Sequence, residues 1–93
     1  MAQNYPNPFN LTTSIQYSVI GDQPLAYITL KIFNLLGQEV VTLVDEPKQP
    51  GYYSVKWDGR NNERRDVSSG VFFYRLSVED GVWSETKKMA LIR

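Results

Sequence analysis

The stretch Val71-Phe72-Phe73-Tyr74-Arg75-Leu76-Ser77-Val78-Glu79-Asp80-Gly81-Val82-Trp83 decides the fold of this chain. Its first part is apolar at every second position, a period typical of a strand with one buried face, at Phe72, Tyr74, Leu76 and Val78. Asp80-Gly81 is the pair that a two-residue type I′ turn prefers, because both turn positions need positive φ. The sequence therefore predicts a β-hairpin whose strands end near Glu79 and begin near Val82.

The same alternation recurs in four further segments, at residues 12–20, 26–34, 53–57 and 82–91. In the last of these the apolar face is thinner, since Glu85 and Lys87 lie between Trp83 and Met89. Each segment is expected to bury one side only.

Residues 35–44 also fit a helix, whose single apolar side would hold Leu36, Val40, Leu43 and Val44. Gly37, the shortness of the segment and its three valines favour a turn at residues 36–38 followed by a strand. No capped run with helical period occurs elsewhere, so the sequence predicts an all-β domain.

About seven short antiparallel strands with single apolar faces need a second sheet to cover them. The predicted fold is a two-layer antiparallel β-sandwich of the immunoglobulin or fibronectin III type, with a small closed barrel as the alternative. The chain has no Cys, so an antibody-type disulfide is excluded and Trp57 with the Tyr and Phe rings must fill the centre.

The composition of the 93 residues fits one domain and excludes several functions. Ten Lys and Arg balance ten Asp and Glu, so no global charge attracts nucleic acid. The absence of His and Cys removes thiol and imidazole catalysis and most zinc sites. We expect a protein that is not an enzyme and needs neither metal nor cofactor.

The N-terminal arm, residues 1–11, is rich in proline and precedes the sandwich at residues 12–93. Pro6 and Pro8 fix φ and stiffen the arm, and the rings of Tyr5 and Phe9 are expected to pack on one end of the sandwich. The arm begins without a basic region or a long apolar run, so it predicts neither a signal peptide nor a transmembrane helix.

The loop Asp58-Gly59-Arg60-Asn61-Asn62-Glu63 is rich in side-chain oxygens. Its spacing lacks the ligand pattern of a calcium loop, and Arg60 would oppose a cation, so a turn stabilised by Asp and Asn is favoured over calcium binding. Exposed aromatic rings could stack on sugars, although some must fill the second layer; the candidates are Tyr27, Phe33, Tyr52 and Phe73.

The closing segment, residues 87–93, carries three positive charges and no negative one. It can be an edge strand guarded against aggregation by charge, or a strand presented to a receptor. The candidate recognition residues are Lys87, Lys88, Met89, Ala90, Leu91, Ile92 and Arg93.

Four blocks of the sequence together resemble the type A C-terminal sorting domains of the type IX secretion system. The first two are Tyr5-Pro6-Asn7-Pro8-Phe9 and residues 32–40, which include Gly37. The others are residues 69–76, with Gly70 and Tyr74, and Lys87-Lys88-Met89-Ala90-Leu91. One departure is the pair Phe72-Phe73, where a Tyr is more usual.

The stretch from Val55 to Asn61, which holds Trp57, Asp58 and Gly59, is similar to a related family, the immunoglobulin-like domain of flagellar hook-capping proteins. The proline arm and the Lys87-Lys88 tail favour the sorting domain over an assembly module of the hook-capping kind. Most of the motif residues are expected to be structural.

The resemblance implies an address label for secretion through the periplasm and outer membrane of a Gram-negative bacterium. Such a domain is the tail of a larger cargo, is recognised by the translocon and is then usually removed by a sortase-like protease upstream of the folded part. Its product is secreted or held at the cell surface, and only protein partners connect it to the outer membrane. The alternative is a non-catalytic accessory domain of a secreted surface hydrolase, which acts as a spacer or binds polysaccharide.

Overall fold

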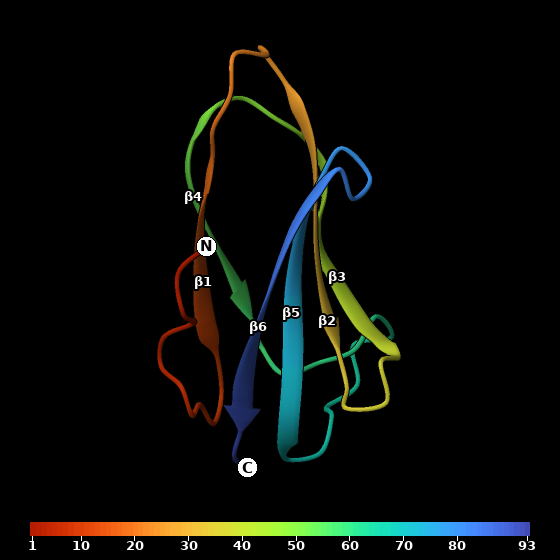
Figure 1. Cartoon of the computed structure of the whole chain (residues 1–93). Helices are drawn as coiled ribbons and strands as arrows, with labels where there is room; N and C mark the ends of the chain where they lie inside the picture. The colour runs from red at the N-terminus through yellow and green to blue at the C-terminus, as the bar shows by residue number, and fades with distance from the viewer.

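The computed structural model describes residues 1–93 and contains six strands and no helix (Figure 1). The strands are β1 (Thr13–Val19), β2 (Ala26–Phe33), β3 (Glu39–Lys48), β4 (Gly51–Trp57), β5 (Gly70–Val78) and β6 (Trp83–Leu91). One layer is the pair β1-β4 and the other is the sheet β3-β2-β5-β6, with every pairing antiparallel. The predicted two-layer sandwich is confirmed. There is no helix long and apolar enough to span a bilayer.

The structure has six strands where about seven were predicted, and the arm adds none. Its backbone forms only isolated bridges with the strands, from Tyr5 to Ser14 and from Phe9 to Leu91. Proline lacks the N–H that a ladder needs, so Pro6 and Pro8 prevent the arm from continuing as a strand. The peptide bonds before both prolines are cis.

The core lies between the two layers and contains the residues that the alternation placed inward. Its fully buried members include Ile15, Ile28, Leu30, Ile32, Trp57, Tyr74, Leu76, Met89 and Leu91. Burying one large apolar side chain stabilises the fold by about 1.5–3 kcal/mol. Trp83 shares the parity of Met89 and Leu91, but it lies at the opposite end of β6, where it lines an open pocket with Val19 at the end of β1, and is 50% exposed.

Residues 34–38 form the predicted turn, and β3 follows in place of the alternative helix. Gly37 has φ +81°, and the Asn34 side chain accepts hydrogen bonds from the N–H groups of Leu36 and Gln38, both at 3.0 Å. The β2–β3 register shifts twice, so β3 carries one extra residue at each shift. Such bulges strengthen the local twist of a strand.

The hairpin between β5 and β6 is present, with a longer connection than predicted. Asp80 and Gly81 have positive φ, and the Val82 N–H donates to the Glu79 carbonyl at 3.3 Å. Glu79 also has positive φ, so the ladder ends at the pair Val78–Trp83 and four residues form the loop.

The arm packs on the sandwich through Phe9, which is 2% exposed, but the expectation for Tyr5 was wrong. Tyr5 is 81% exposed, while its neighbour Asn4 is 2% exposed. Successive residues of an extended segment point to opposite sides. Asn4 takes the inward position, so the ring of Tyr5 points to solvent and only its backbone pairs with Ser14.

Candidate functional site

The sequence blocks that carry the family resemblance meet at one end of the sandwich. The ring of Phe9 lies 5.5 Å from that of Trp57, and Trp57 lies 5.3 Å from Phe72 in an edge-on arrangement. These three rings come from the arm, from β4 and from β5. Aromatic pairs in such geometry contribute about 0.5–1.5 kcal/mol beyond the area they bury. The three rings therefore hold the three segments in one place.

The closing segment is divided between core and surface. Met89 and Leu91 are 1% and 2% exposed, while Lys87 and Ala90 are half-buried. Lys87 lies 3.8 Å from Glu85 in an ion pair. The exposed side chains of the segment are those of Lys88 and Ile92, while the side chain of Arg93 is only 29% exposed. Only part of the predicted recognition segment is thus available to a partner.

The arm also covers the edge of β6 that was expected to be free. The Phe9 N–H donates to the Ala90 carbonyl at 3.1 Å, and the Ile92 N–H donates to the Phe9 carbonyl at 2.8 Å. The Asn7 side chain accepts the Ala90 N–H at 3.0 Å. Since these backbone groups are already paired, a receptor cannot add a strand along residues 90–92, and the expectation of a bare edge there was wrong.

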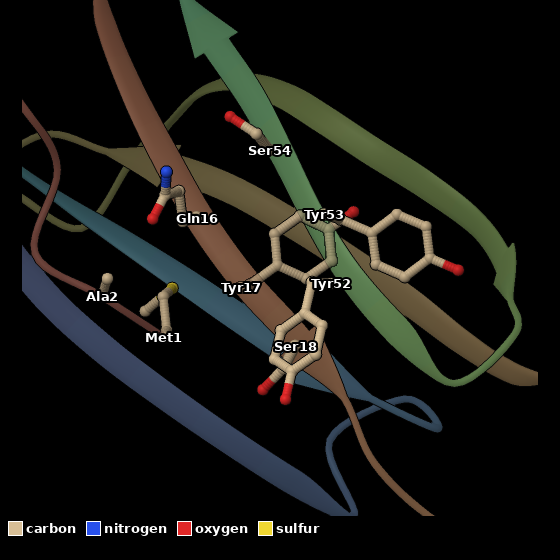
Figure 2. A pocket seen from close by; sticks show the side chains of 8 residues that line it. All are labelled: Met1, Ala2, Gln16, Tyr17, Ser18, Tyr52, Tyr53 and Ser54. Carbon is tan, nitrogen blue, oxygen red and sulfur yellow. The ribbon is translucent and has the colours of Figure 1, made fainter.

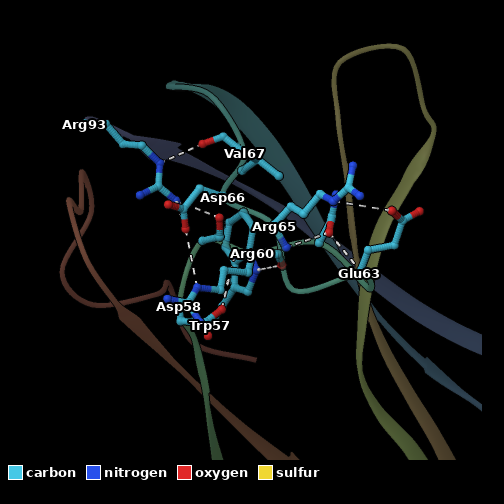
Figure 3. A network of polar contacts seen from close by, with 10 residues as sticks. Trp57, Asp58, Arg60, Glu63, Arg65, Asp66, Val67 and Arg93 are labelled. Atoms are coloured by element: carbon cyan, nitrogen blue, oxygen red, sulfur yellow. Dashed lines mark hydrogen bonds and ion pairs between the residues drawn. The ribbon is translucent and has the colours of Figure 1, made fainter.

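Arg93 closes this end of the domain by contacting the loop at residues 58–67 (Figure 3). Its guanidinium donates to the carbonyl of Val67 at 2.6 Å and to that of Gly59 at 2.7 Å. Asp66 lies 3.7 Å away and supplies the opposite charge. The Arg93 backbone N–H donates to the Ser69 hydroxyl at 2.9 Å, so the end of the closing segment is held to two other blocks.

The loop considered for calcium is a turn organised by its own side chains. The Asp58 carboxylate accepts the Arg60 N–H at 3.2 Å, and the side-chain Oδ1 of Asn61 accepts the N–H groups of Glu63 and Arg65 at 2.9 and 3.1 Å. The indole N–H of Trp57 donates to the Arg60 carbonyl at 2.9 Å. No group of three acidic side chains in the structure could hold a metal ion.

Of the aromatic residues considered for stacking on sugars, Tyr52 stands out at 92% exposed. It lies on the outer face of β4, beside Ser18 and Gln16 of β1 and Ser54 of its own strand (Figure 2). Phe33 and Phe73 face each other across β2 and β5, half-buried, and Arg75 lies 4.9 Å from the Phe33 ring. Tyr27 donates a hydrogen bond to Asp45.

Two buried polar residues at the base of the arm were missed by the sequence analysis. Asn4 donates to the Thr13 hydroxyl at 2.9 Å, and Thr13 donates to the Pro6 carbonyl at 2.8 Å. The phenol of Tyr74 accepts the Asn4 N–H at 2.9 Å and donates to the Ala2 carbonyl at 3.1 Å. Burial raises the pKa of Tyr74 above its ordinary value, and the Asn4 N–H partly offsets the shift. The only feature of the sequence that pointed to this buried network was a polar side chain, Asn4, next to the proline block.

The fold and this junction define an immunoglobulin-like β-sandwich domain whose arm and closing segment are bonded to each other. The family described as the FlgD Ig-like domain matches residues 4–81, and the chain belongs to this family. The resemblance to the immunoglobulin-like domain of hook-capping proteins is thereby confirmed. The whole of β6 and the closing segment lie beyond the matched residues.

Two solved structures from Porphyromonas gingivalis share the fold. The crystal structure of dimeric latent PorU has a TM-score of 0.73 and 17% identity, over 97% of this chain and 9% of that one. PorZ, described as an essential bacterial surface component of the type-IX secretion system, has a TM-score of 0.60 and 24% identity, over 98% of this chain and 11% of that one. The chain thus spans a small part of either protein. No curated protein matches the sequence.

Proposed function

We propose that this domain is a type A C-terminal sorting domain, which directs a larger cargo at its N-terminal side through the type IX secretion system. The observation that carries the proposal is the direct bonding of the proline arm to the closing segment. These are the two blocks that distinguish the sorting domains from the related family. Membership of the FlgD Ig-like family and the fold shared with PorZ support it.

In this proposal the domain is a ligand for other proteins and not a catalyst. Its partners are the translocon and a sortase-like protease, and the cargo ends outside the cell or on its surface in a Gram-negative bacterium. Contact with the outer membrane is made only through these proteins. The receptor reads a folded surface, composed of the exposed side chains of Lys88 and Ile92 and the neighbouring arm, because the backbone edge at residues 90–92 is occupied.

The test is export of a reporter fused to residues 3–93 behind a signal peptide, in a host with the translocon. A truncation at Thr86 would not be informative, since it also removes Met89 and Leu91 from the core. The double variant Lys88→Glu, Ile92→Ser changes only exposed side chains, so its stability should stay within about 1 kcal/mol of the parent. We expect its export to fall at least several-fold, with the fusion retained in the periplasm.

The matched control is Arg64→Glu, which makes the same change of charge on an exposed loop residue outside the closing segment. It should be exported like the parent. Undiminished export of the Lys88 and Ile92 variant would remove this surface from the proposed recognition site. Failure of the parent fusion to leave the periplasm in a competent host would contradict the sorting function itself.

A second candidate function, a polysaccharide-binding accessory domain, is favoured by one observation. Tyr52 offers an almost fully exposed ring beside the hydroxyl and amide groups of Ser18, Ser54 and Gln16, a combination suited to a sugar ring (Figure 2). Titration with cell-wall glycans distinguishes the sorting function from the polysaccharide-binding function. Saturable binding that is lost in Tyr52→Ala would favour the accessory function.

A further inference from the structure

The two layers of the sandwich have four outer edges, and three of them are covered over part of their length. The arm pairs with β1 through Ala2 and Tyr5, and with the end of β6 through Phe9, which leaves the β6 backbone at Ser84 and Thr86 without a partner outside the sheet. The edge of β3 is interrupted by two bulges and by Pro47. The loop residue Asn62 also bonds to it, donating to the Val40 carbonyl at 3.1 Å. These are the devices by which natural proteins prevent unwanted strand pairing.

The fourth edge, on β4, has no such cover. In an antiparallel pair, alternate residues of a strand direct both backbone groups to the same neighbour. The backbone groups of Ser14 and Gln16, even-numbered residues of β1, bond to the arm. The odd-numbered residues of β1 therefore bond to β4, where their partners are also odd-numbered, such as Val55 and Tyr53. The N–H and carbonyl groups of the residues in between therefore point outward, at Tyr52, Ser54 and Lys56. None of these groups has a hydrogen bond outside the sheet.

Burial supports the same conclusion. On β1, the inward side chains of Ile15 and Tyr17 are 0% and 5% exposed. Their partners on β4, Val55 and Tyr53, also face inward but are only half-buried. A strand added beyond β4 would cover the exposed flank of these two side chains.

We propose that β4 is the homodimer interface of this domain, where it pairs antiparallel with β4 of a second copy about a two-fold axis at Ser54. The two β1-β4 pairs then join into one four-stranded sheet. In this register Tyr52 lies opposite the partner's Lys56, and Ser54 lies opposite its own counterpart. All three outward-pointing residues of each strand are then used in the ladder.

The second copy is favoured as the occupant because β4 is complementary to itself. The only charge on the edge, Lys56, faces a tyrosine ring, so the two lysines do not repel each other. The half-buried Tyr53 meets the partner's Val55 on the inward side. Shifting the axis to Tyr53 would set Lys56 against Pro50, which has no N–H, and shifting it to Val55 would set Tyr52 against Asp58 beyond the end of the strand.

The first test is sedimentation of the 93-residue chain from low-micromolar to millimolar concentration. One strand pair is a small interface, so we expect a weak, concentration-dependent dimer. Ser54→Pro removes an N–H that the monomer does not use and should leave a folded monomer throughout the range. Ser54→Ala keeps the N–H and should dimerise like the parent. A parent that stays monomeric at millimolar concentration overturns the proposal, as does a Ser54→Pro variant that dimerises equally well.

A second measurement does not depend on how well the proline variant folds. The chain contains no Cys, so Ser54→Cys introduces a single thiol at the two-fold axis. Mild oxidation should convert most of this variant into a disulfide-linked dimer. Gln16→Cys lies on the same face but one strand further in, so its thiols would be separated by about three strand spacings of ~4.8 Å and should not cross-link. Equal cross-linking at the two positions would contradict the interface.

Discussion

The side chain of Arg93 lies directly against the backbone of Gly59, although the two are 34 positions apart. Nη2 of Arg93 donates to the Gly59 carbonyl at 2.7 Å, and a Cβ on Gly59 would lie 2.6 Å from that nitrogen. Gly59 itself is buried and has φ +73°. The absence of a side chain at this position therefore permits both the turn after Trp57 and the approach of the last residue of the chain.

Gly59→Ala should destabilise the domain more than Gly37→Ala, which is the matched control. Both glycines have similar positive φ, but no atom lies within 4 Å of a Cβ at Gly37. The backbone term alone is about 1–2 kcal/mol in each case. Gly59→Ala also displaces Arg93 and loses its hydrogen bonds, so we expect roughly 1 kcal/mol more in denaturant unfolding.

Making Gly59→Ala and Gly37→Ala in an Arg93→Ala background separates the backbone cost of positive φ from the cost of displacing Arg93. With the guanidinium removed, Gly59→Ala and Gly37→Ala should have equal effects on the free energy of unfolding. A persistent difference would mean that the Gly59 site is sensitive for a reason other than Arg93, such as its 3.6 Å approach to Leu91.

Local periodicity predicted the layers because the strand period of two depends only on neighbours in the sequence. Ile28, Leu30 and Ile32 of β2 are all 0% exposed, as the alternation required. Periodicity does not report how far the second layer extends. Trp83 has the correct parity, yet it lies in an open pocket beside the end of β1 and is half-exposed.

The candidate site was less predictable because it depends on contacts between distant residues. Lys88 and Met89 are adjacent in one charged and apolar segment, and only the structure shows that one is exposed and the other is in the core. The prolines indicated a stiff arm, but a segment interrupted by proline has no regular period. Nothing in the sequence therefore showed that Asn4 and not Tyr5 faces inward, or that Phe9 pairs with Ala90.

Phe9→Ala should be among the most destabilising changes in the arm. Phe9 is 2% exposed and packs against Trp57, so truncation leaves a cavity between the arm and β4 and should cost about 3–5 kcal/mol. Tyr5→Ala is the matched control, since it removes a ring of the same motif that is 81% exposed, and should change stability by less than about 0.5 kcal/mol. Thermal unfolding followed by circular dichroism measures both. Equal effects would contradict the assignment of Phe9 as the anchor.

Thr13→Val should destabilise the base of the arm without altering its shape. Valine has nearly the same volume, but the Pro6 carbonyl loses the Thr13 hydroxyl, and the buried amide of Asn4 loses one of its two acceptors and keeps only the Pro6 carbonyl at 3.1 Å. We expect a loss of about 1–3 kcal/mol in urea unfolding. The adjacent Thr12 is exposed, so Thr12→Val should have little effect. A neutral Thr13→Val would show that the hydroxyl does not secure the arm.

Tyr74 should make the domain sensitive to high pH. Burial raises the pKa of its phenol above the ordinary value of 10, so the unfolded chain releases the proton at a lower pH than the native domain does. The stability contributed by the neutral phenol is therefore complete below pH 10 and is lost as the pH rises through the native pKa.

Tyr74→Phe should cost about 1–3 kcal/mol at pH 7, because the Asn4 N–H and the Ala2 carbonyl lose their partner. Above pH 10 its stability should fall less steeply than that of the parent. A residual slope is expected, since burial also raises the pKa of Tyr17. Urea unfolding at intervals from pH 7 to pH 11 measures both slopes, and parallel curves would contradict the role assigned to Tyr74.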